Sequence, residues 1–213
     1  MSSIGDLRRE YAQRALTEES ASPNPFHQFA QWFEEAVRAD LLDANAMTLA
    51  TIGLDAAPNA RTVLLKGFDE DGFVFFTNYE SAKGRELTAT PAACLLFFWA
   101  ELERQVRITG STARVTAEES SNYFATRPVD SQLGAWSSQQ SAVVPDRAAL
   151  EARFEEMRAR YAGAAVPRPP FWGGYRVTPV RIEFWQGRRG RLHDRLLYTR
   201  GDDGRWTRER LSP

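Results

Sequence analysis

The sequence has few of the residues that build disulfides, metal clusters or membrane spans. Its 213 residues include one cysteine, Cys94, and two histidines, His27 and His193. A single cysteine cannot form an intramolecular disulfide, and three such distant side chains make no zinc cluster, so we expect no bound metal. No apolar run approaches the roughly 18 residues of a membrane span, and the charged N-terminus lacks the apolar core of a signal peptide. We therefore expect a soluble, cytoplasmic protein without a membrane partner, and Cys94, within an apolar run, to be a buried thiol.

Lysine is almost absent from a chain that is otherwise rich in charge. The 27 basic residues nearly balance 28 acidic ones, and only Lys66 and Lys83 are lysines, so the other 25 are arginines. A GC-rich genome favours arginine codons, which explains the arginine excess but not why two lysines remain where they are. With 43% hydrophobic residues the chain can bury a sizeable core, which excludes global disorder.

Hydrophobic periodicity predicts one helix followed by a run of antiparallel strands with inserted helices. Asn24 and Pro25 mark a helix start, and a stripe of apolar residues at spacings of three and four predicts its buried face: Phe26, Phe29, Phe33 and Val37. Segments rich in β-branched and aromatic residues predict strands at 46–53, 60–68, 73–78, 93–99, 104–115, 176–187, 191–200 and 205–211. Capping signals and prolines predict helices at 81–90, 116–127, 128–136 and 145–161.

The order of these elements predicts the fold class and the domains. Mostly antiparallel strands without a βαβ alternation favour a mainly β fold, an antiparallel barrel with peripheral helices. We expect a mobile N-terminal arm over residues 1–20, with a short charged helix at 4–16, followed by a single domain over 21–213.

Two groups of residues could bind an anion. In the predicted strand 191–200, Arg191, His193 and Arg195 alternate onto one face and form an anion-seeking row, although a solvated basic face with an incidental histidine is the alternative. The preceding strand ends in residues that could line a flat ring, namely Phe184, Trp185 and Gln186.

The second group lies where one predicted helix ends and the next begins. Tyr123, Arg127 and Ser131 are spaced by four, and Pro128 interrupts the helix between them. A helix end followed by a new helix start places free backbone N–H groups beside a guanidinium, a phenol and a hydroxyl, which suits a phosphate. Ordinary capping is the alternative interpretation.

Three further cations have less obvious partners. Arg61 and Lys66 bracket one predicted strand, and a spacing of five places them on opposite faces unless a bulge or a subunit boundary intervenes. Lys83 lies in the first turn of a short helix, where the helix dipole also attracts a phosphate. For each lysine, a surface charge is the ordinary interpretation. Neither a P-loop nor a GxGxxG motif is present.

Six segments, in the same order, resemble the pyridoxamine (pyridoxine) 5'-phosphate oxidases. They are RTVLLK, FTN with SAKGRE, LERQVR, NYFATRPVDSQLGAWSSQQS, FWGGYR and IEFWQGRRGRLHDR, of which the last is the most specific. The resemblance covers almost the whole chain. It implies a split-barrel homodimer that holds FMN at the subunit interface.

The resemblance also implies roles for individual residues. FMN is expected to contact Arg61, Val63, Leu64, Lys66, Phe76, Thr77, Lys83, Gln105, Gln140, Ser141, Trp185 and Arg195. The substrate phosphate is expected at Lys66, Tyr123, Arg127 and Ser131, and the pyridine ring beneath the candidate catalytic residues Arg191 and His193. Arg8 and Tyr11 match an arm that covers the substrate.

The implied reaction is oxidation of pyridoxamine or pyridoxine 5'-phosphate to pyridoxal 5'-phosphate. Hydride passes from C4' of the substrate to the flavin, and O2 reoxidises the flavin with release of H2O2. We hypothesise that His193 assists removal of a proton from the amine or alcohol of the substrate. Two positions depart from the family pattern, Ala82 where arginine is frequent and Phe76 where tyrosine is common, so we expect somewhat weaker flavin binding.

Other functions remain open from the sequence. A related flavin oxidase could act on a phenazine precursor, which has no phosphate for the Tyr123 group to bind. Residues 176–213 contain ten arginines, five acidic residues and two tryptophans, which could indicate a nucleic-acid-binding module, although the net charge of -1 and the lack of a binding motif argue against a nucleic-acid partner. A flavin carrier without turnover is a third alternative.

Overall fold

The computed structural model describes Tyr11 and residues 14–213. The strands of this part are β1 (Ala46–Ile52), β2 (Pro58–Leu64), β3 (Gly67–Asp69), β4 (Gly72–Asn78), β5 (Ala92–Trp99), β6 (Arg104–Arg114), β7 (Trp172–Gln186), β8 (Asp194–Arg200) and β9 (Trp206–Arg210). The α-helices of this part are α1 (Pro25–Arg38), α2 (Ala82–Ala89), α3 (Ala117–Thr126), α4 (Val129–Ser137) and α5 (Arg147–Arg160). These elements confirm the mainly β prediction, except that the predicted strand 60–68 is divided into β2 and β3.

The helices start where their capping residues predict. The Asn24 side chain accepts hydrogen bonds from the backbone N–H groups of Phe26 and His27, and Thr116 accepts one from Glu119. Ser81 caps α2 in the same way by accepting from the N–H of Gly84. No helix in residues 14–213 is long and apolar enough to cross a membrane.

The order of the strands explains why the sheet closes into a barrel. Adjacent strands follow the order β2-β1-β5-β6-β7-β4-β3, and every pairing is antiparallel, with β8 added beside β7 and β9 beside β8. The outermost strands β2 and β3 are consecutive in the chain and are joined only by Leu65 and Lys66. Such a link spans at most roughly 11 Å, so the sheet must curl until its edges meet. We call Leu65 and Lys66 the seam.

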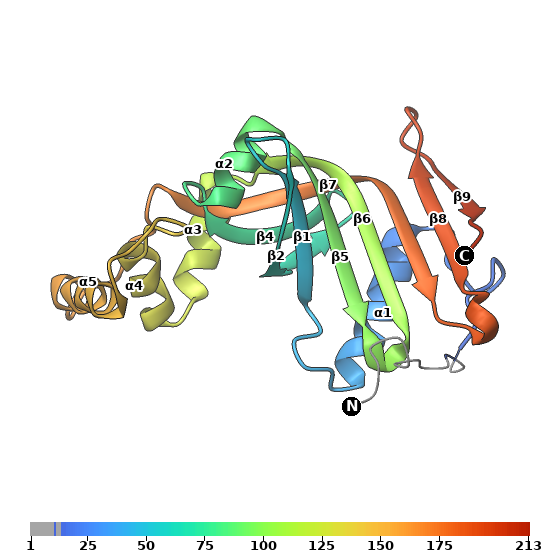
Figure 1. The fold of residues 1–213 in the computed structure, drawn as a ribbon, viewed down its shortest axis with the longest axis horizontal. Helices are drawn as coiled ribbons and strands as arrows, with labels where there is room; N and C mark the ends of the chain where they lie inside the picture. The colour runs from blue at the N-terminus through green and yellow to red at the C-terminus, as the bar shows by residue number, and fades with distance from the viewer. Residues whose placement is uncertain (1–10, 12–13) are drawn as a thin grey trace.

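The long strand β7 leaves the barrel halfway along its length. Its first half pairs with β4 and its second half pairs with β8, which lies at the other end of the molecule from α3, α4 and α5 (Figure 1). The register of β6 against β7 shifts at Gly110. A Cβ at this position would lie 2.0 Å from the carbonyl oxygen of Thr178, so only glycine permits this close approach.

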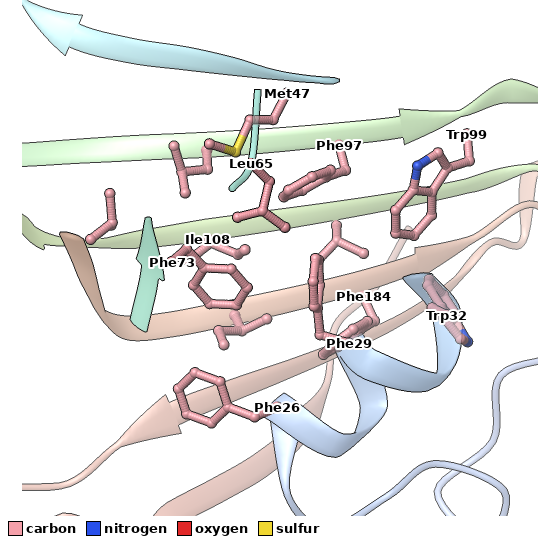
Figure 2. Close-up of a cluster of buried hydrophobic side chains, with 14 of the residues drawn as sticks. Phe26, Phe29, Trp32, Met47, Leu65, Phe73, Phe97, Trp99, Ile108 and Phe184 are labelled. Atoms are coloured by element: carbon pink, nitrogen blue, oxygen red, sulfur yellow. The ribbon is translucent and has the colours of Figure 1, made fainter. Parts of the chain in front are cut away.

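The core fills the space between α1 and the concave face of the sheet (Figure 2). Phe29 is fully buried, and its ring centroid lies 4.9 Å from that of Phe73 and 5.2 Å from that of Phe97. The prediction that Val37 belongs to this core is wrong, because Val37 lies in the last turn of α1 and is 55% exposed. Trp32, which the predicted stripe missed, is buried instead.

Two other predictions need correction. Cys94 is half-buried rather than buried, because it alternates with Ala93 and Leu95 onto the outer face of β5. Tyr11 and residues 14–16 are not helical, and the remainder of the predicted helix lies outside the described residues. The division into an arm and a domain stays a prediction, although Leu16 belongs to the core and its backbone N–H donates to Asp194.

We expect Phe29→Ala to lower the free energy of unfolding by about 3–5 kcal/mol, because it removes a buried ring from an aromatic cluster. Val37→Ala on the same helix should change it by less than about 0.5 kcal/mol. Urea titrations of both variants at equal protein concentration check this prediction. Similar losses in the two variants would contradict the description of the core.

Candidate functional site

A cavity of about 900 Å³ opens between β2, the end of β4, α2 and the junction of α3 with α4. Four basic residues line it, Arg61, Lys66, Lys83 and Arg127, and none of its lining residues is acidic. We call this space the cationic cavity. Because four positive side chains face it without a lining carboxylate, its chemistry favours an anionic ligand.

The seam brings Arg61 and Lys66 into the same cavity. The predicted strand would have placed them on opposite faces, but β2 ends at Leu64 and the chain turns before β3 begins. The backbone N–H of Lys66 donates to the carbonyl oxygen of Val74 at 2.8 Å. The interruption therefore replaces the bulge or subunit boundary that the spacing of five required.

Lys83 and the loop before α5 form one end of the cavity. The Lys83 Nζ donates to Gln140 Oε1 at 3.2 Å, and Thr77 Oγ1 donates to the same oxygen at 3.2 Å. Ser141, in a left-handed conformation with φ of 74°, accepts from the backbone N–H of Ala82. Burial and the nearby charge of Arg61 lower the pKa of Lys83. These positioned donors at the start of α2 suit a phosphate.

Arg127 and its neighbours form the other end. The predicted interruption at Pro128 is confirmed, since α3 ends at Thr126 and α4 begins at Val129 with no side-chain cap. The Arg127 guanidinium lies 4.6 Å from the ring centroid of Trp172. Its Nη1 is buried and has no hydrogen-bond partner among the described residues. An unpaired buried donor beside an uncapped helix start indicates a place for an anion.

An aromatic stack supports this end of the cavity. The ring of Phe76 lies parallel to that of Tyr123, with centroids 4.0 Å apart, and parallel to that of Trp172 at 5.5 Å. Phe76 therefore fills the position where the family commonly has tyrosine with a ring that contacts both neighbours. Ser131 lies on the first turn of α4 and also lines the cavity.

A second group of predicted residues lies elsewhere. The ring centroid of His193 is 4.6 Å from that of Trp185 and 5.8 Å from that of Tyr11. Gln105 and Arg195 are the cross-strand neighbours of Trp185 on β6 and β8. We call these five residues the His193 cluster. None of them lines the cationic cavity. Arg8 lies outside the described residues.

The predicted strand at 191–200 is wrong at its start. Arg189–Arg191 forms a short 3-10 helix, and β8 begins only at Asp194, so simple alternation does not place Arg191 and His193. Arg191 has φ of 62°, a left-handed conformation that is uncommon for a non-glycine residue. No ion pair joins it to any residue in the described part of the chain. Strain of this kind is often found at functional sites.

His193 has a defined protonation pattern. Its Nδ1 accepts a hydrogen bond from the backbone N–H of Arg188 at 3.1 Å, so the neutral ring carries its proton on Nε2. Burial, followed by the positive charge of Arg191, lowers the pKa of His193. At neutral pH this imidazole is therefore a hydrogen-bond donor through Nε2.

Within one chain the two groups cannot act together. Trp172 lines the cationic cavity and Trp185 belongs to the His193 cluster, and they lie near opposite ends of β7. Trp185 follows Trp172 by thirteen positions along the strand, which corresponds to roughly 40 Å along the chain. In Figure 1 helices α3 and α4, at whose junction the cavity lies, and strands β8 and β9 occupy opposite ends of the molecule.

Some residues of the site were not found from the sequence. Trp172 and Asn78 line the cationic cavity, and Glu86 lies beneath it as the buried partner of Arg61. Trp172 belongs to the segment FWGGYR, which could have indicated it. Glu86 is the last residue of the segment SAKGRE, but its neighbours in the chain do not reveal its role, because its contacts are with β1 and β2.

Several arginines of the basic C-terminal region are paired with carboxylates. Arg176 pairs with Asp69, and Arg195 with Glu183. Arg210 pairs with Glu18 and Asp194. These arginines bind the protein's own carboxylates, which weakens the alternative of a nucleic-acid-binding module.

Fold and site define an antiparallel β-barrel protein with a cavity suited to anions. Residues 33–161 match the family described as "Pyridoxamine 5'-phosphate oxidase", and residues 172–213 match "Pyridoxine 5'-phosphate oxidase C-terminal dimerisation region". A "Pyridoxine/pyridoxamine 5'-phosphate oxidase" of Rubrobacter xylanophilus is 60% identical over 99% of this chain and 96% of that protein. One of the same name from Burkholderia multivorans is 58% identical over the full length of both. The chain belongs to the pyridoxamine 5'-phosphate oxidase family.

Solved structures agree with this assignment. PhzG from Burkholderia lata, in complex with tetrahydrophenazine-1-carboxylic acid, superposes with a TM-score of 0.88 and 32% identity over 95% of this chain and 99% of that chain. An FMN binding protein from Nostoc punctiforme, related to pyridoxamine 5'-phosphate oxidase, has a TM-score of 0.72 over 90% of this chain and all of that chain. At 20% identity the latter shows the fold alone. The expected split barrel is confirmed.

We expect Arg191→Ala to raise the pKa of His193, because it removes a positive charge that disfavours the imidazolium. The pKa should stay below its ordinary value, since burial is the larger cause of its lowering. An NMR titration of the ring protons measures this, with His27→Gln to assign the two histidines. An unchanged or lower pKa would contradict the coupling between Arg191 and His193.

Proposed function

We propose that the protein is an FMN-dependent oxidase that converts pyridoxamine 5'-phosphate or pyridoxine 5'-phosphate to pyridoxal 5'-phosphate, with O2 as acceptor and H2O2 as product. The observation that carries this proposal is the cationic cavity, which has donors for a phosphate at each of two ends and no acidic lining residue. Full-length relatives with 58–60% identity that bear the oxidase name support the same reaction.

The residues present fit FMN. Lys83, Thr77 and the backbone at Ala82 would hold its phosphate, with Gln140 and Ser141 closing that end and Arg61 beside them. Lys83 and Thr77 both bond the Gln140 carboxamide oxygen, so their donors already converge on one oxygen atom. Val63 and Leu64 line the cavity where the flat ring system would lie. When bound, FMN supplies the acceptor for hydride.

The opposite end would hold the phosphate of the substrate. Arg127 has an unpaired buried Nη1, and Tyr123 and Ser131 present hydroxyl groups to the same space. Lys66, at the seam, lines the same cavity and would face both phosphates. Aromatic contacts hold Tyr123 and Arg127, so the protein's contribution is to orient the substrate and balance its charge.

A homodimer would complete the site. The match of residues 172–213 to a dimerisation region supports this assembly, and Phe98 and Leu64 present exposed apolar side chains on the outer face of the sheet. Because the His193 cluster lies far from the cavity of its own chain, we infer that it covers the cavity of the partner. Gln105, Trp185 and Arg195 would then contact FMN across the interface, and Tyr11 the substrate.

In that arrangement Arg191 and His193 would contact the pyridine ring of the substrate. Arg191 has no ion pair within the described chain and can take the role of an anion or ring partner. His193 can donate from Nε2, and it could accept a proton only if its bond to the Arg188 N–H were lost. We therefore expect His193→Asn, which keeps a side-chain donor, to retain more activity than His193→Phe.

The phenazine-type alternative is supported by the likeness to PhzG. That structure holds a carboxylic acid without a phosphate, whereas the Arg127 end of this cavity offers a guanidinium, a phenol and a hydroxyl together. The lower identity, 32% against 58–60%, also favours the vitamin substrate.

Purified protein should be yellow, and pyridoxamine 5'-phosphate in air should yield pyridoxal 5'-phosphate and an equal amount of H2O2. Absorbance of the product and a peroxidase-coupled assay measure the two. A colourless protein that cannot be reconstituted with FMN would exclude all the flavin functions. A yellow protein inert toward both phosphorylated substrates would favour the phenazine-type oxidase.

We expect Lys66→Arg to weaken binding of both FMN and substrate by about tenfold, the scale of one hydrogen bond to a charged group. A compact ammonium can approach a phosphate oxygen where a broad guanidinium does not fit. Flavin fluorescence titration and the KM for pyridoxamine 5'-phosphate check this, with the exposed change Arg200→Lys as control. Wild-type values in Lys66→Arg would make Lys66 an ordinary surface charge.

A further inference from the structure

A buried carboxylate lies beneath the cationic cavity. Glu86, on α2, is 4% exposed. Its Oε1 accepts from Asn59 Nδ2 at 2.8 Å, and its Oε2 accepts from Thr51 Oγ1 at 2.6 Å and from Arg61 Nη2 at 2.9 Å. Glu86 therefore joins α2 to β1 and β2 through both of its carboxylate oxygens.

These contacts hold one part of the Arg61 guanidinium and leave another part free. Nη1 bonds to Thr51 Oγ1 and to the carbonyl oxygen of Leu49. Nη2 donates one of its two N–H groups to Glu86. The Nε–H and the second Nη2–H have no hydrogen-bond partner among the described residues, and Arg61 lines the cavity. Arg61 thus keeps two N–H donors for a ligand, while its bonds to Leu49, Thr51 and Glu86 determine its orientation.

Glu86 also connects Arg61 with the second lysine. Lys83 lies three residues earlier on α2, so the bond between Glu86 and Arg61 limits how far the two cations can separate. Although burial alone would raise the pKa of Glu86, the hydrogen bonds from Thr51, Asn59 and Arg61 lower it, and the group is a carboxylate at neutral pH. Its charge opposes the lowering of the Lys83 pKa.

Charge and geometry make opposite predictions for this carboxylate. A negative charge close to an anion site repels the anion, so considered by charge alone Glu86 weakens binding. An arginine without a partner, in contrast, must lose its rotamer freedom each time it binds a ligand. The three side chains that donate hydrogen bonds to Glu86 favour the geometric effect.

We propose that Glu86 is a positioning residue that holds Arg61, and through α2 also Lys83, in the orientation that binds the FMN phosphate. The inference rests on the proposed function, because it takes FMN as the anion. Glu86 does not touch the ligand. It acts by keeping two cations at a constant separation.

The test is the dissociation constant of FMN, measured by flavin fluorescence on apoprotein. Glu86→Gln should weaken binding about tenfold, the scale seen when a supporting partner of a ligand-binding group is lost. Glu86→Asp keeps the charge but shortens the reach, and it should also weaken binding. Equal or tighter binding in Glu86→Gln would overturn the proposal, since that is the result expected from charge alone.

A double-mutant cycle separates positioning from a general loss of structure. In an Arg61→Met background, Glu86→Gln should change the FMN dissociation constant less than twofold, because the group it orients is absent. A full tenfold effect without Arg61 would overturn the mechanism. Glu35→Gln is the matched control, since Glu35 pairs with Arg104 outside the cavity, and it should leave FMN binding unchanged.

Inorganic phosphate distinguishes failure of this inference from failure of the proposed function. If the wild type binds no FMN, the oxidase proposal fails. The rise in melting temperature on adding phosphate can then still be compared between Glu86→Gln and wild type. A smaller rise in the variant supports positioning, and an equal rise overturns it.

Discussion

The two-residue seam between β2 and β3 is the constraint on which the rest of the structure depends. Leu65 is buried, and its backbone is bonded on both sides to Asn45, while the N–H of Lys66 bonds to Val74 on β4. So short a link forces the edges of the sheet together, and the curl encloses the aromatic core against α1. The same turn directs Lys66 into the cationic cavity, so closure of the barrel and construction of the site are one event.

Positive side chains that lie close together in the cavity repel one another, and groups outside the cavity lining or against its wall offset part of this repulsion. Glu86 neutralises Arg61, and the Trp172 ring lies under the Arg127 guanidinium. Lys83 has no carboxylate within hydrogen-bond distance among the described residues, and burial lowers its pKa. A site with this charge distribution gains stability when an anion binds, because the ligand supplies the missing negative charge.

Two positions with strained backbones stand in the two halves of the proposed site. Ser141 closes the Lys83 end in a left-handed conformation, and Arg191 has a similar conformation beside His193. Such geometry usually persists only where surrounding contacts impose it. If the partner subunit brings Arg191 to the cavity, both strained residues meet around the same pair of ligands, and dimerisation and catalysis depend on one interface.

The sequence by itself determined most helix starts, most strands and the order of motifs, because capping, periodicity and turn chemistry act between residues close in the chain. Asn24, Thr116 and Pro128 are examples. The exposure of Val37, the strained turn at Arg191 and the partnership of Glu86 with Arg61 depended on tertiary contacts between distant segments. Likewise, strand periodicity separated Arg61 from Lys66, and only the closed barrel joined them, because the meeting of two sheet edges is a property of the whole sheet.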